Sequence, residues 1–489
     1  MAAVQLSAQR ARAVVSKETV TELQTAIHGQ VLVPAGDGYD EARRIWNGMI
    51  DKRPALIARC TSTADVIAAV DFAREHGVPL SVRGGGHNVA GKALCDDGLV
   101  IDLSPMRAVH VDPDARVVRA QGGATLGDID RETSAGGGFG LAVPLGVVSR
   151  TGVAGLCLHG GMGWLTRKHG LTLDNLIAVE IVTADGRLRR ASETENADLF
   201  WAVRGGGGNF GVVTSFEFRA HSISPEVWFL CAMYPMSQAK RIVQFLERFM
   251  RQAPEELAVL VSLWSAPNDE SIPSEHRGEP VIVLLGCYSG PFEKGERTIQ
   301  PLRELGEPVA DLSGPMPFAQ VQCSLDADYP DGRLYYWKSV YLPELDEQII
   351  DVLVDAARRR PSPLTSIDVW FLAGAAMRVR TDATAYVRRD VPYAIGIESN
   401  WTDPAESDAN VAWAKKLFDA LQPFSRGTYL NFPGFMEDSE KLLRGAYGAN
   451  YKRLGAIKAR YDPDNLFKGA LNIPPNPPVA ERNPPSADK

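Results

Sequence analysis

Residues 83–88 read Arg83-Gly84-Gly85-Gly86-His87-Asn88, and this loop decides how the fold is interpreted. Consecutive glycines let backbone N–H groups converge on an anion, because glycine adopts conformations that side chains forbid. The loop is not a Walker A loop, since no Gly-Lys-Ser/Thr follows, and it lacks the spacing and following helix of a dinucleotide fingerprint. His87 at its end is either a nucleophile beside a bound ligand or the cap of a turn.

The segments around this loop predict regular elements. Residues 63–76 place apolar side chains at helical spacing and stop at Gly77, while residues 79–82 and 99–103 read as strands. Glycine clusters occur at 84–86, 122–123, 136–138, 160–163 and 205–208. Five clusters so close along the chain indicate one extended ligand that passes several loops.

Bulk properties exclude several classes of protein. A chain of 489 residues favours two domains, and a net charge of −8 without a basic patch argues against a nucleic-acid partner. The sequence lacks an apolar run long enough for a membrane span, and residues 1–17 lack the apolar core of a signal peptide. The six cysteines show no CxxC spacing, so we expect neither a metal site nor a disulfide framework. We therefore expect a cytoplasmic protein that contacts no membrane.

The pattern changes after about residue 222. Alternating strands and helices then indicate an α+β domain on a mostly antiparallel sheet. The expected strands are 259–264, 281–285, 368–372 and 394–401, and the expected helices are 238–250, 345–358 and 408–421. Residues 440–459 predict one long amphipathic helix, and the proline-rich tail at 474–489 predicts disorder.

Many ordered motifs together resemble the p-cresol methylhydroxylase / vanillyl-alcohol oxidase (PCMH/VAO) superfamily of flavoproteins, in its berberine-bridge-enzyme-like branch. The motifs are the 83–88 loop, Gln121–Gly127, Gly152–Gly155, Gly160–Trp164, Lys168–Leu171, Asp198–Trp201, Arg204–Gly211, Tyr461–Phe467 and Asn472–Pro475. The resemblance covers roughly residues 30–476. Within the family, the chain looks most similar to the enterocin-pathway flavoprotein and to 6-hydroxy-D-nicotine oxidase.

The resemblance implies a two-domain α+β fold of the PCMH/VAO type. Residues 1–222 would form the FAD-binding domain, residues 223–430 a substrate domain with a mostly antiparallel sheet flanked by helices, and residues 431–489 a C-terminal segment that completes the FAD domain. It also implies FAD attached through its 8α carbon to His87. Many members bond a cysteine to flavin C6, but Val148 occupies that position here, so Cys157 is interpreted as a structural thiol.

The resemblance assigns a set of residues to the cofactor. They are Arg83, Gly84, Gly85, Gly86, His87, Asn88, Ser104, Gln121, Gly122, Gly123, Thr125, Gly127, Gly146, Val148, Ser149, Thr151, Gly152, Gly155, Gly161, Trp164, Asn175, Asn209, Val213, Asn431 and Asn472. Thr151 would border flavin C4a and control oxygen access, or pack a turn. Trp164 would border the flavin ring, or serve as ordinary aromatic packing.

A substrate that gives up a hydride needs a base for its O–H or N–H proton. Asp368 shares a strand face with Trp370 and Leu372. Burying a carboxylate among apolar residues costs free energy, so its presence there indicates a functional role. Glu398 is a second candidate, although its alternation with neighbouring residues favours a solvent-facing position. Tyr429, expected on a strand that lines the flavin with Asn431, is a further candidate base, with ring packing as the alternative.

The function expected from these residues is oxidation of a small organic molecule by FAD, which O2 then reoxidises to give H2O2. One alternative is a flavin-dependent oxygenating enzyme of secondary metabolism, and a second, from another class, is a flavin-storing or flavin-sensing protein. The sequence names neither the substrate nor the oligomeric state.

Overall fold

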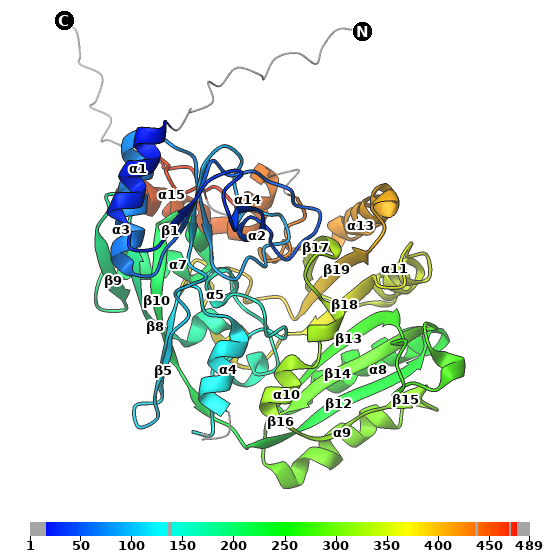
Figure 1. Ribbon diagram of the computed structural model, residues 1–489. Coiled ribbons are helices and arrows are strands. Elements are labelled where there is room, and N and C mark those ends of the chain that lie inside the picture. Colours follow the sequence, from blue (N-terminus) through cyan, green and yellow to red (C-terminus); the bar gives the residue numbers. More distant parts are fainter. Residues whose placement is uncertain (1–15, 135–138, 436–438, 469–470, 477–489) are drawn as a thin grey trace, which may run out of the picture.

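The computed structural model describes residues 16–134, 139–435, 439–468 and 471–476. Two bodies are built from separate sheets, with a cavity where they meet (Figure 1). The expected α+β class is therefore confirmed. The glycines at 136–138, residues 1–15 and the tail at 477–489 lie outside the described residues, as do the predictions made for them.

The first body contains a four-stranded sheet in the order β1-β2-β4-β3. Its strands are β1 (Gln30–Leu32), β2 (Leu56–Arg59), β4 (Leu99–Asp102) and β3 (Leu80–Arg83). Both β2 and β3 run parallel to β4, and helix α3 (Thr63–His76) makes the crossover from β2 to β3. The 84–98 loop thus leaves the carboxyl end of a parallel strand, where α/β sheets commonly bind ligands.

A five-stranded antiparallel sheet continues this body in the order β5-β6-β10-β8-β9. It comprises β5 (Val109–Asp112), β6 (Val117–Gln121), β10 (Val212–Arg219), β8 (Leu176–Val182) and β9 (Leu188–Ser192). A two-stranded sheet pairs β7 (Leu141–Ala142) with β11 (His221–Ser222).

The second body is an eight-stranded antiparallel sheet. Its strands are β15 (Ala310–Asp311), β12 (Glu226–Pro235), β14 (Pro280–Tyr288), β13 (Leu257–Ser265), β18 (Ser366–Phe371), β19 (Tyr393–Trp401) and β17 (Leu334–Leu342), with β16 (Gly314–Pro317) beside β12. Helices cover one face (Figure 1), namely α8 (Ala239–Met250), α9 (Gly295–Arg303), α11 (Glu347–Arg358) and α13 (Ser407–Leu421).

Side chains alternate between the two faces of this sheet. Val261, Val369 and Ile397 belong to the core beneath the helices, whereas Leu260 and Trp370 belong to a core shared with the first body. Because the pleat has a period of two, residues 260, 262, 368, 370, 396 and 398 all point toward the first body. This second face forms one wall of the cavity.

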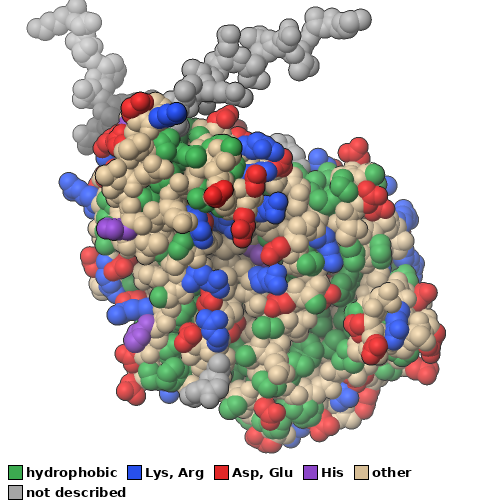
Figure 2. Space-filling model, in the orientation of Figure 1, with side chains coloured by type: hydrophobic (Ala, Val, Ile, Leu, Met, Phe, Trp, Pro, Cys, Tyr) green, Lys and Arg blue, Asp and Glu red, His purple; other side chains and the backbone are tan. Residues whose placement is uncertain are grey.

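The C-terminal segment returns to the first body. Instead of the single helix expected over 440–459, the structure has α14 (Ser439–Tyr447) and α15 (Tyr451–Tyr461), separated by a turn in which Gly448 has φ +46°. Helix α15 contacts α7 (Ala197–Gly206), and Lys458 Nζ donates to the backbone oxygen of Asn209 at 2.7 Å. Acidic and basic side chains intermingle on the face seen in Figure 2. Over the described ranges, no helix has the length and apolar character needed to cross a bilayer.

Candidate active site

A cavity of about 1550 Å³ lies between the two bodies. Its first wall is formed by residues 84–89, 146–148, 151–152 and 154–156, and the opposite wall by Leu260, Trp337, Asp368, Trp370 and Glu398. Small-molecule pockets usually occupy roughly 300–1,000 Å³. The cavity therefore has room for an extended cofactor and a small substrate together.

The glycine loop approaches its neighbours too closely for side chains. A Cβ on Gly85 would lie 2.5 Å from the backbone nitrogen of Gly152, and one on Gly84 would lie 3.0 Å from the Gly122 oxygen. Gly86 has φ +70°, which side chains disfavour. Glycine here lets the 84–88 loop and the 146–152 segment form one continuous wall.

His87 is held between this loop and an aromatic stack. Its imidazole stacks on Trp46 with ring centroids 4.1 Å apart, and Tyr335 stacks on Trp46 at 3.7 Å. Among the described atoms, His87 Nε2 is buried and has no hydrogen-bond partner. Burial lowers the pKa of His87 to about 3, so near neutral pH the ring is uncharged and keeps a nitrogen lone pair. An unpartnered nucleophilic nitrogen at the cavity fits covalent attachment of a cofactor.

The residues assigned to the cofactor divide into two groups, and their roles stay predictions. The first group lines the cavity and comprises Gly84, Gly85, Gly86, His87, Asn88, Gly146, Val148, Thr151, Gly152, Gly155, Val213, Asn431 and Asn472. The second group lies outside its lining and comprises Arg83, Ser104, Gln121, Gly122, Gly123, Thr125, Gly127, Ser149, Gly161, Trp164, Asn175 and Asn209.

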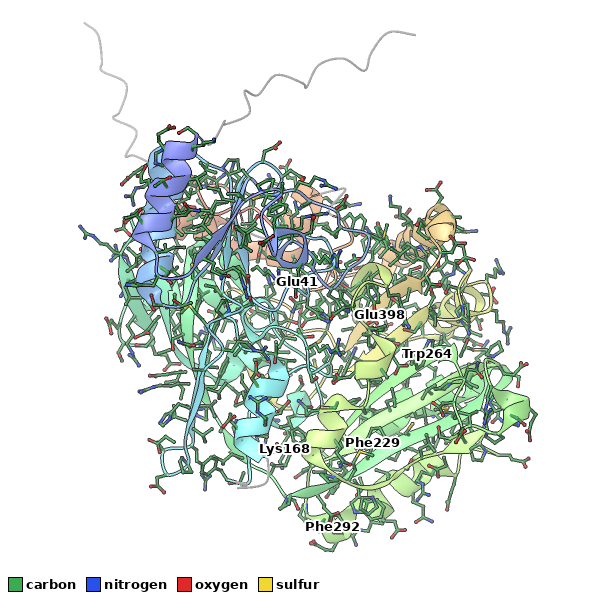
Figure 3. All side chains as sticks on the ribbon, in the orientation of Figure 1. Glu41, Lys168, Phe229, Trp264, Phe292 and Glu398 are labelled. Atoms are coloured by element: carbon green, nitrogen blue, oxygen red, sulfur yellow. The ribbon has the colours of Figure 1, made fainter. Side chains whose placement is uncertain are left out.

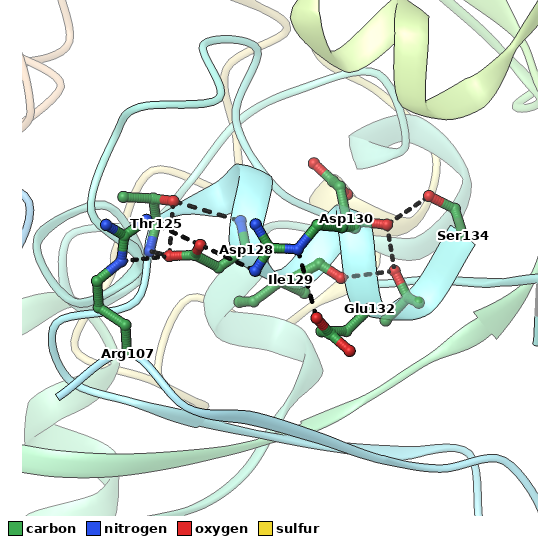
Figure 4. Close-up of polar contacts among 9 residues, drawn as sticks. Arg107, Thr125, Asp128, Ile129, Asp130, Glu132 and Ser134 are labelled. Carbon is green, nitrogen blue, oxygen red and sulfur yellow. Dashed lines mark hydrogen bonds and ion pairs between the residues drawn. The ribbon is translucent and has the colours of Figure 1, made fainter. Parts of the chain in front are cut away.

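Members of the second group have partners within the protein. Thr125 and Asp128 cap helix α4 (Leu126–Ser134) by exchanging hydrogen bonds between side chain and backbone, and Arg107 also bonds to Asp128 (Figure 4). Ser149 binds Asp326 through its backbone N–H at 2.7 Å and through its hydroxyl at 2.5 Å. These residues do not line the cavity, and their hydrogen bonds hold in place the segments that do.

Cys157 is fully buried in helix α5 (Val153–Leu158) and is not among the residues that line the cavity. Burial raises the pKa of its thiol, which disfavours the nucleophilic thiolate. Val148, by contrast, lines the cavity at the position where relatives were expected to carry cysteine. This geometry agrees with a single covalent bond.

Asp368 and Glu398 form a pair of carboxyl groups on the opposite wall. Each is only 4% exposed, so the solvent-facing position favoured for Glu398 was wrong. Figure 3 marks the position of Glu398 in the second body. Asp368 stands opposite Gly396 in the sheet register, and the missing side chain there leaves space for the Glu398 carboxyl. The two carboxyl side chains therefore lie side by side over Gly396.

Two hydroxyl groups donate hydrogen bonds to the carboxyl pair. Ser262 donates to Asp368 at 2.7 Å, and Tyr329 donates to Glu398 at 2.8 Å. Burial raises the pKa of Asp368 to about 6, and burial together with the Asp368 charge raises the pKa of Glu398 well above its usual range. Two carboxyl groups so close together do not readily both ionise, so the pair shares one proton near neutral pH.

Tyr429 and Asn431 lie in a turn, not on the expected strand, because Phe432 N–H bonds back to the Tyr429 oxygen. Both still line the cavity, and Asn431 Nδ2 donates to the Tyr429 hydroxyl at 2.8 Å. The Gly161 N–H donates to the same hydroxyl at 3.1 Å. Burial nevertheless raises the pKa of Tyr429, so it is a weaker candidate base than Asp368 near neutral pH.

Trp164 lies behind the wall. Only 1% of it is exposed, and its ring lies 5.7 Å from that of Trp370, which does line the cavity. This placement corresponds to aromatic packing. Thr151 lines the cavity, and its N–H donates to the Val148 oxygen. It therefore lies at the end of the 146–151 segment, on the cavity wall opposite the eight-stranded sheet.

Three residues of the site, Trp46, Tyr329 and Trp337, were not predicted from the sequence. Trp337 lies on β17, and the aromatic-rich residues 334–342 carried a strand signal that could have revealed it. Trp46 and Tyr329 are held by backbone contacts distant in sequence, such as Trp46 Nε1–H to the Tyr329 oxygen at 2.9 Å. A local sequence pattern does not reveal contacts between residues so far apart in the chain.

Comparison with known proteins agrees with this geometry. A family model described as FAD binding domain matches residues 54–192, and one described as berberine and berberine like matches residues 428–474. The chain is 31% identical over 463 residues to an FAD-linked oxidoreductase of Dictyostelium discoideum, covering 94% of this chain and 97% of that protein. The chain belongs to the berberine-bridge-like FAD-linked oxidoreductases. It is thus an enzyme with FAD as its cofactor.

Solved structures of this family superpose on the chain. For 6-hydroxy-D-nicotine oxidase from Arthrobacter nicotinovorans the TM-score is 0.81 at 30% identity, covering 92% of this chain and 98% of that one. For the glucooligosaccharide oxidase of Acremonium strictum, in which a novel flavinylation was described, the TM-score is 0.81 at 26% identity, covering 94% and 99%. These matches confirm the family and fold expected from the sequence.

Proposed function

We propose that the protein is an oxidase that transfers a hydride from a small organic substrate to FAD held covalently by His87, with O2 as the final acceptor. One observation carries the proposal: the cavity presents the unpartnered His87 Nε2 on one wall and a buried carboxyl pair on the other. The first fits attachment of the cofactor, and the second fits removal of a substrate proton.

Residues on the two walls of the cavity would have different roles. The glycine loop at 84–86 would hold the anionic part of FAD through backbone N–H groups. When bound, FAD supplies the two-electron redox chemistry. Asp368 would accept the substrate O–H or N–H proton, because it is the more acidic member of its pair and lines the cavity.

Surrounding groups would prepare Asp368 for this role. Ser262 donates to its carboxylate at 2.7 Å, which holds the acceptor oxygen in place, and the Glu398 side chain lies beside it. Tyr429 would orient the substrate from the adjoining wall, and Thr151 would border the route of O2, as its family position implies. The aromatic rings of Trp337 and Trp370 would exclude water from the reacting atoms.

A substrate screen tests the proposal. The purified holoenzyme is mixed anaerobically with alcohols, amines, sugars and phenols, and bleaching of flavin absorbance is followed before O2 is admitted. We expect at least one class to bleach the flavin, and O2 to restore the colour with one H2O2 formed per reduced flavin. An oxygenated product without H2O2 would identify an oxygenating enzyme instead. Absence of bleaching by every class would contradict the proposal.

A further inference from the structure

The substrate end of the cavity has an unusual chemical character. Its walls are the aromatic rings of Tyr329, Trp337, Trp370, Tyr429 and Phe432, together with Leu260 and Leu325. Tyr329 and Trp337 meet edge to face at 5.4 Å, as do Trp337 and Phe432 at 4.9 Å and Tyr429 and Phe432 at 5.4 Å. Tyr329, Trp337, Phe432 and Tyr429 thus form one connected series of rings beside the carboxyl pair, and Trp370 lines the cavity separately.

The carboxyl pair carries a negative charge that no described cation of this wall offsets. The Lys and Arg residues that line the cavity, Lys52, Arg74, Lys92 and Lys468, come from the first body and the C-terminal segment. The hydroxyl groups beside the pair, those of Ser262, Tyr329 and Ser366, are neutral. Asp368 and Glu398 lie side by side over Gly396, and two adjacent carboxyl groups do not readily both ionise. They therefore share one proton, and one negative charge remains on a wall of aromatic and apolar groups.

Burying an unpaired charge raises the free energy of the folded protein, and a cation bound beside that charge offsets this cost. Aromatic faces also attract cations, and most strongly where water is excluded. A sugar would suit the site poorly, because its many hydroxyl groups would find few free polar partners on these walls. The walls favour a ligand with one positive charge and an apolar body.

We propose that the substrate is a protonated amine with an aromatic or other apolar body, and that the Asp368–Glu398 pair is its counter-ion. This inference rests on the proposed oxidase function and names its substrate class. The ammonium N–H proton passes to the Asp368 carboxylate, which leaves a nitrogen lone pair. The hydrogen on the adjacent carbon leaves with two electrons as a hydride to FAD, and the lone pair completes a C=N bond. The substrate ends as an iminium ion. O2 takes up the two electrons with the proton of the hydride and one proton from water to give H2O2, and Asp368 releases its proton to solvent.

Binding is tested with benzyltrimethylammonium, a cation without a nitrogen lone pair that cannot follow this route. Its perturbation of the flavin absorbance of the holoenzyme gives a dissociation constant, to be compared with those of benzyl methyl ether and phenylacetate. We expect the cation to bind at least about tenfold more tightly than the ether. We expect phenylacetate to bind most weakly, because like charges repel.

Variants assign the effect to the carboxyl pair. Asp368→Asn combined with Glu398→Gln preserves shape and removes the charge, and should abolish the preference for the cation. Asp419→Asn makes a single charge change at an exposed position of α13 and should leave the preference intact. If the double variant does not retain flavin, Asp368→Asn alone is compared by the same titration. Equal binding of cation and ether by the wild type, or a preference that survives in the variant, would overturn the inference.

Turnover separates this inference from the proposed function. N-methylbenzylamine and benzyl alcohol are compared for anaerobic bleaching of the holoenzyme, with faster bleaching expected for the amine. Bleaching by alcohols or sugars but by no amine would leave an oxidase and reject the amine assignment. Preferential cation binding without bleaching by any compound would retain the anionic site and reject the oxidase.

Discussion

His87 and Trp46 stack with their ring planes inclined by 19° and their centroids 4.1 Å apart. Trp46 is itself fixed by Tyr335, which stacks on it, and by the Tyr329 carbonyl, which accepts its N–H. One indole therefore covers a face of the imidazole and joins the glycine loop to the body that carries the carboxyl pair. The proposed attachment of FAD at His87 and the packing of the two bodies therefore depend on the same aromatic contact.

We expect His87→Ala to lose covalent flavin, and Trp46→Leu to slow its attachment by about tenfold or more, because a loosely held nucleophile seldom reaches the reacting geometry. Flavin fluorescence of the denatured protein after gel electrophoresis measures the bound fraction over time, and peptide mass locates it. Trp413→Leu, a partly buried tryptophan of α13, serves as the control. Flavin released entirely from denatured wild type would contradict covalent attachment.

Cys157→Ser should leave both flavin attachment and the visible spectrum unchanged, because the thiol is buried in α5 away from the cavity lining. Protein flavin content and the absorbance spectrum of the variant provide the measurement. A 6-thioether spectrum in the wild type that disappears in this variant would show that a second bond exists.

The sequence predicted the local framework well, because its signals are local. Helix α3 begins and ends where the apolar spacing and Gly77 indicated, and the strand expected at 394–401 differs from β19 by one residue. The position of Glu398 was not predictable from alternation alone, since both faces of β19 are buried, one under helices and one at the cavity. Its role arises from the register that places Asp368 opposite Gly396, a long-range pairing.

Asp368→Asn should slow anaerobic flavin reduction by roughly 10²–10⁴-fold, the usual contribution of a positioned general base. Reoxidation of the reduced flavin by O2 should be almost unchanged, because no substrate proton moves in that half-reaction. Stopped-flow absorbance resolves the two steps with any substrate found in the screen. If the variant is reduced at the wild-type rate, the base lies elsewhere and Tyr429 becomes the leading candidate.

The rate of flavin reduction should depend on pH through the carboxyl pair. Burial raises the pKa of Asp368 to about 6, and the base works only when ionised, so reduction should fall as pH drops through about 6 and level off above it. Glu398→Leu removes a hydrogen bond that favours the ionised form and should move the midpoint upward. A pH profile that is the same in wild type and variant would remove Glu398 from the proton-accepting pair.

Thr151 is proposed to border the oxygen route without contacting the substrate proton, so its effect should appear in the opposite half-reaction. Its side chain lies at the cavity wall, at the end of the 146–151 segment. Thr151→Leu adds bulk there and should obstruct approach of O2, which slows reoxidation while leaving anaerobic reduction largely intact. Thr151→Ser keeps the hydroxyl with less bulk and should reoxidise at least as fast as wild type. Stopped-flow mixing of pre-reduced enzyme with buffers of known O2 concentration gives the second-order rate constant for each. Wild-type reoxidation in Thr151→Leu would show that O2 arrives by another route, while the assignment of His87 and Asp368 would remain, because neither depends on this side chain.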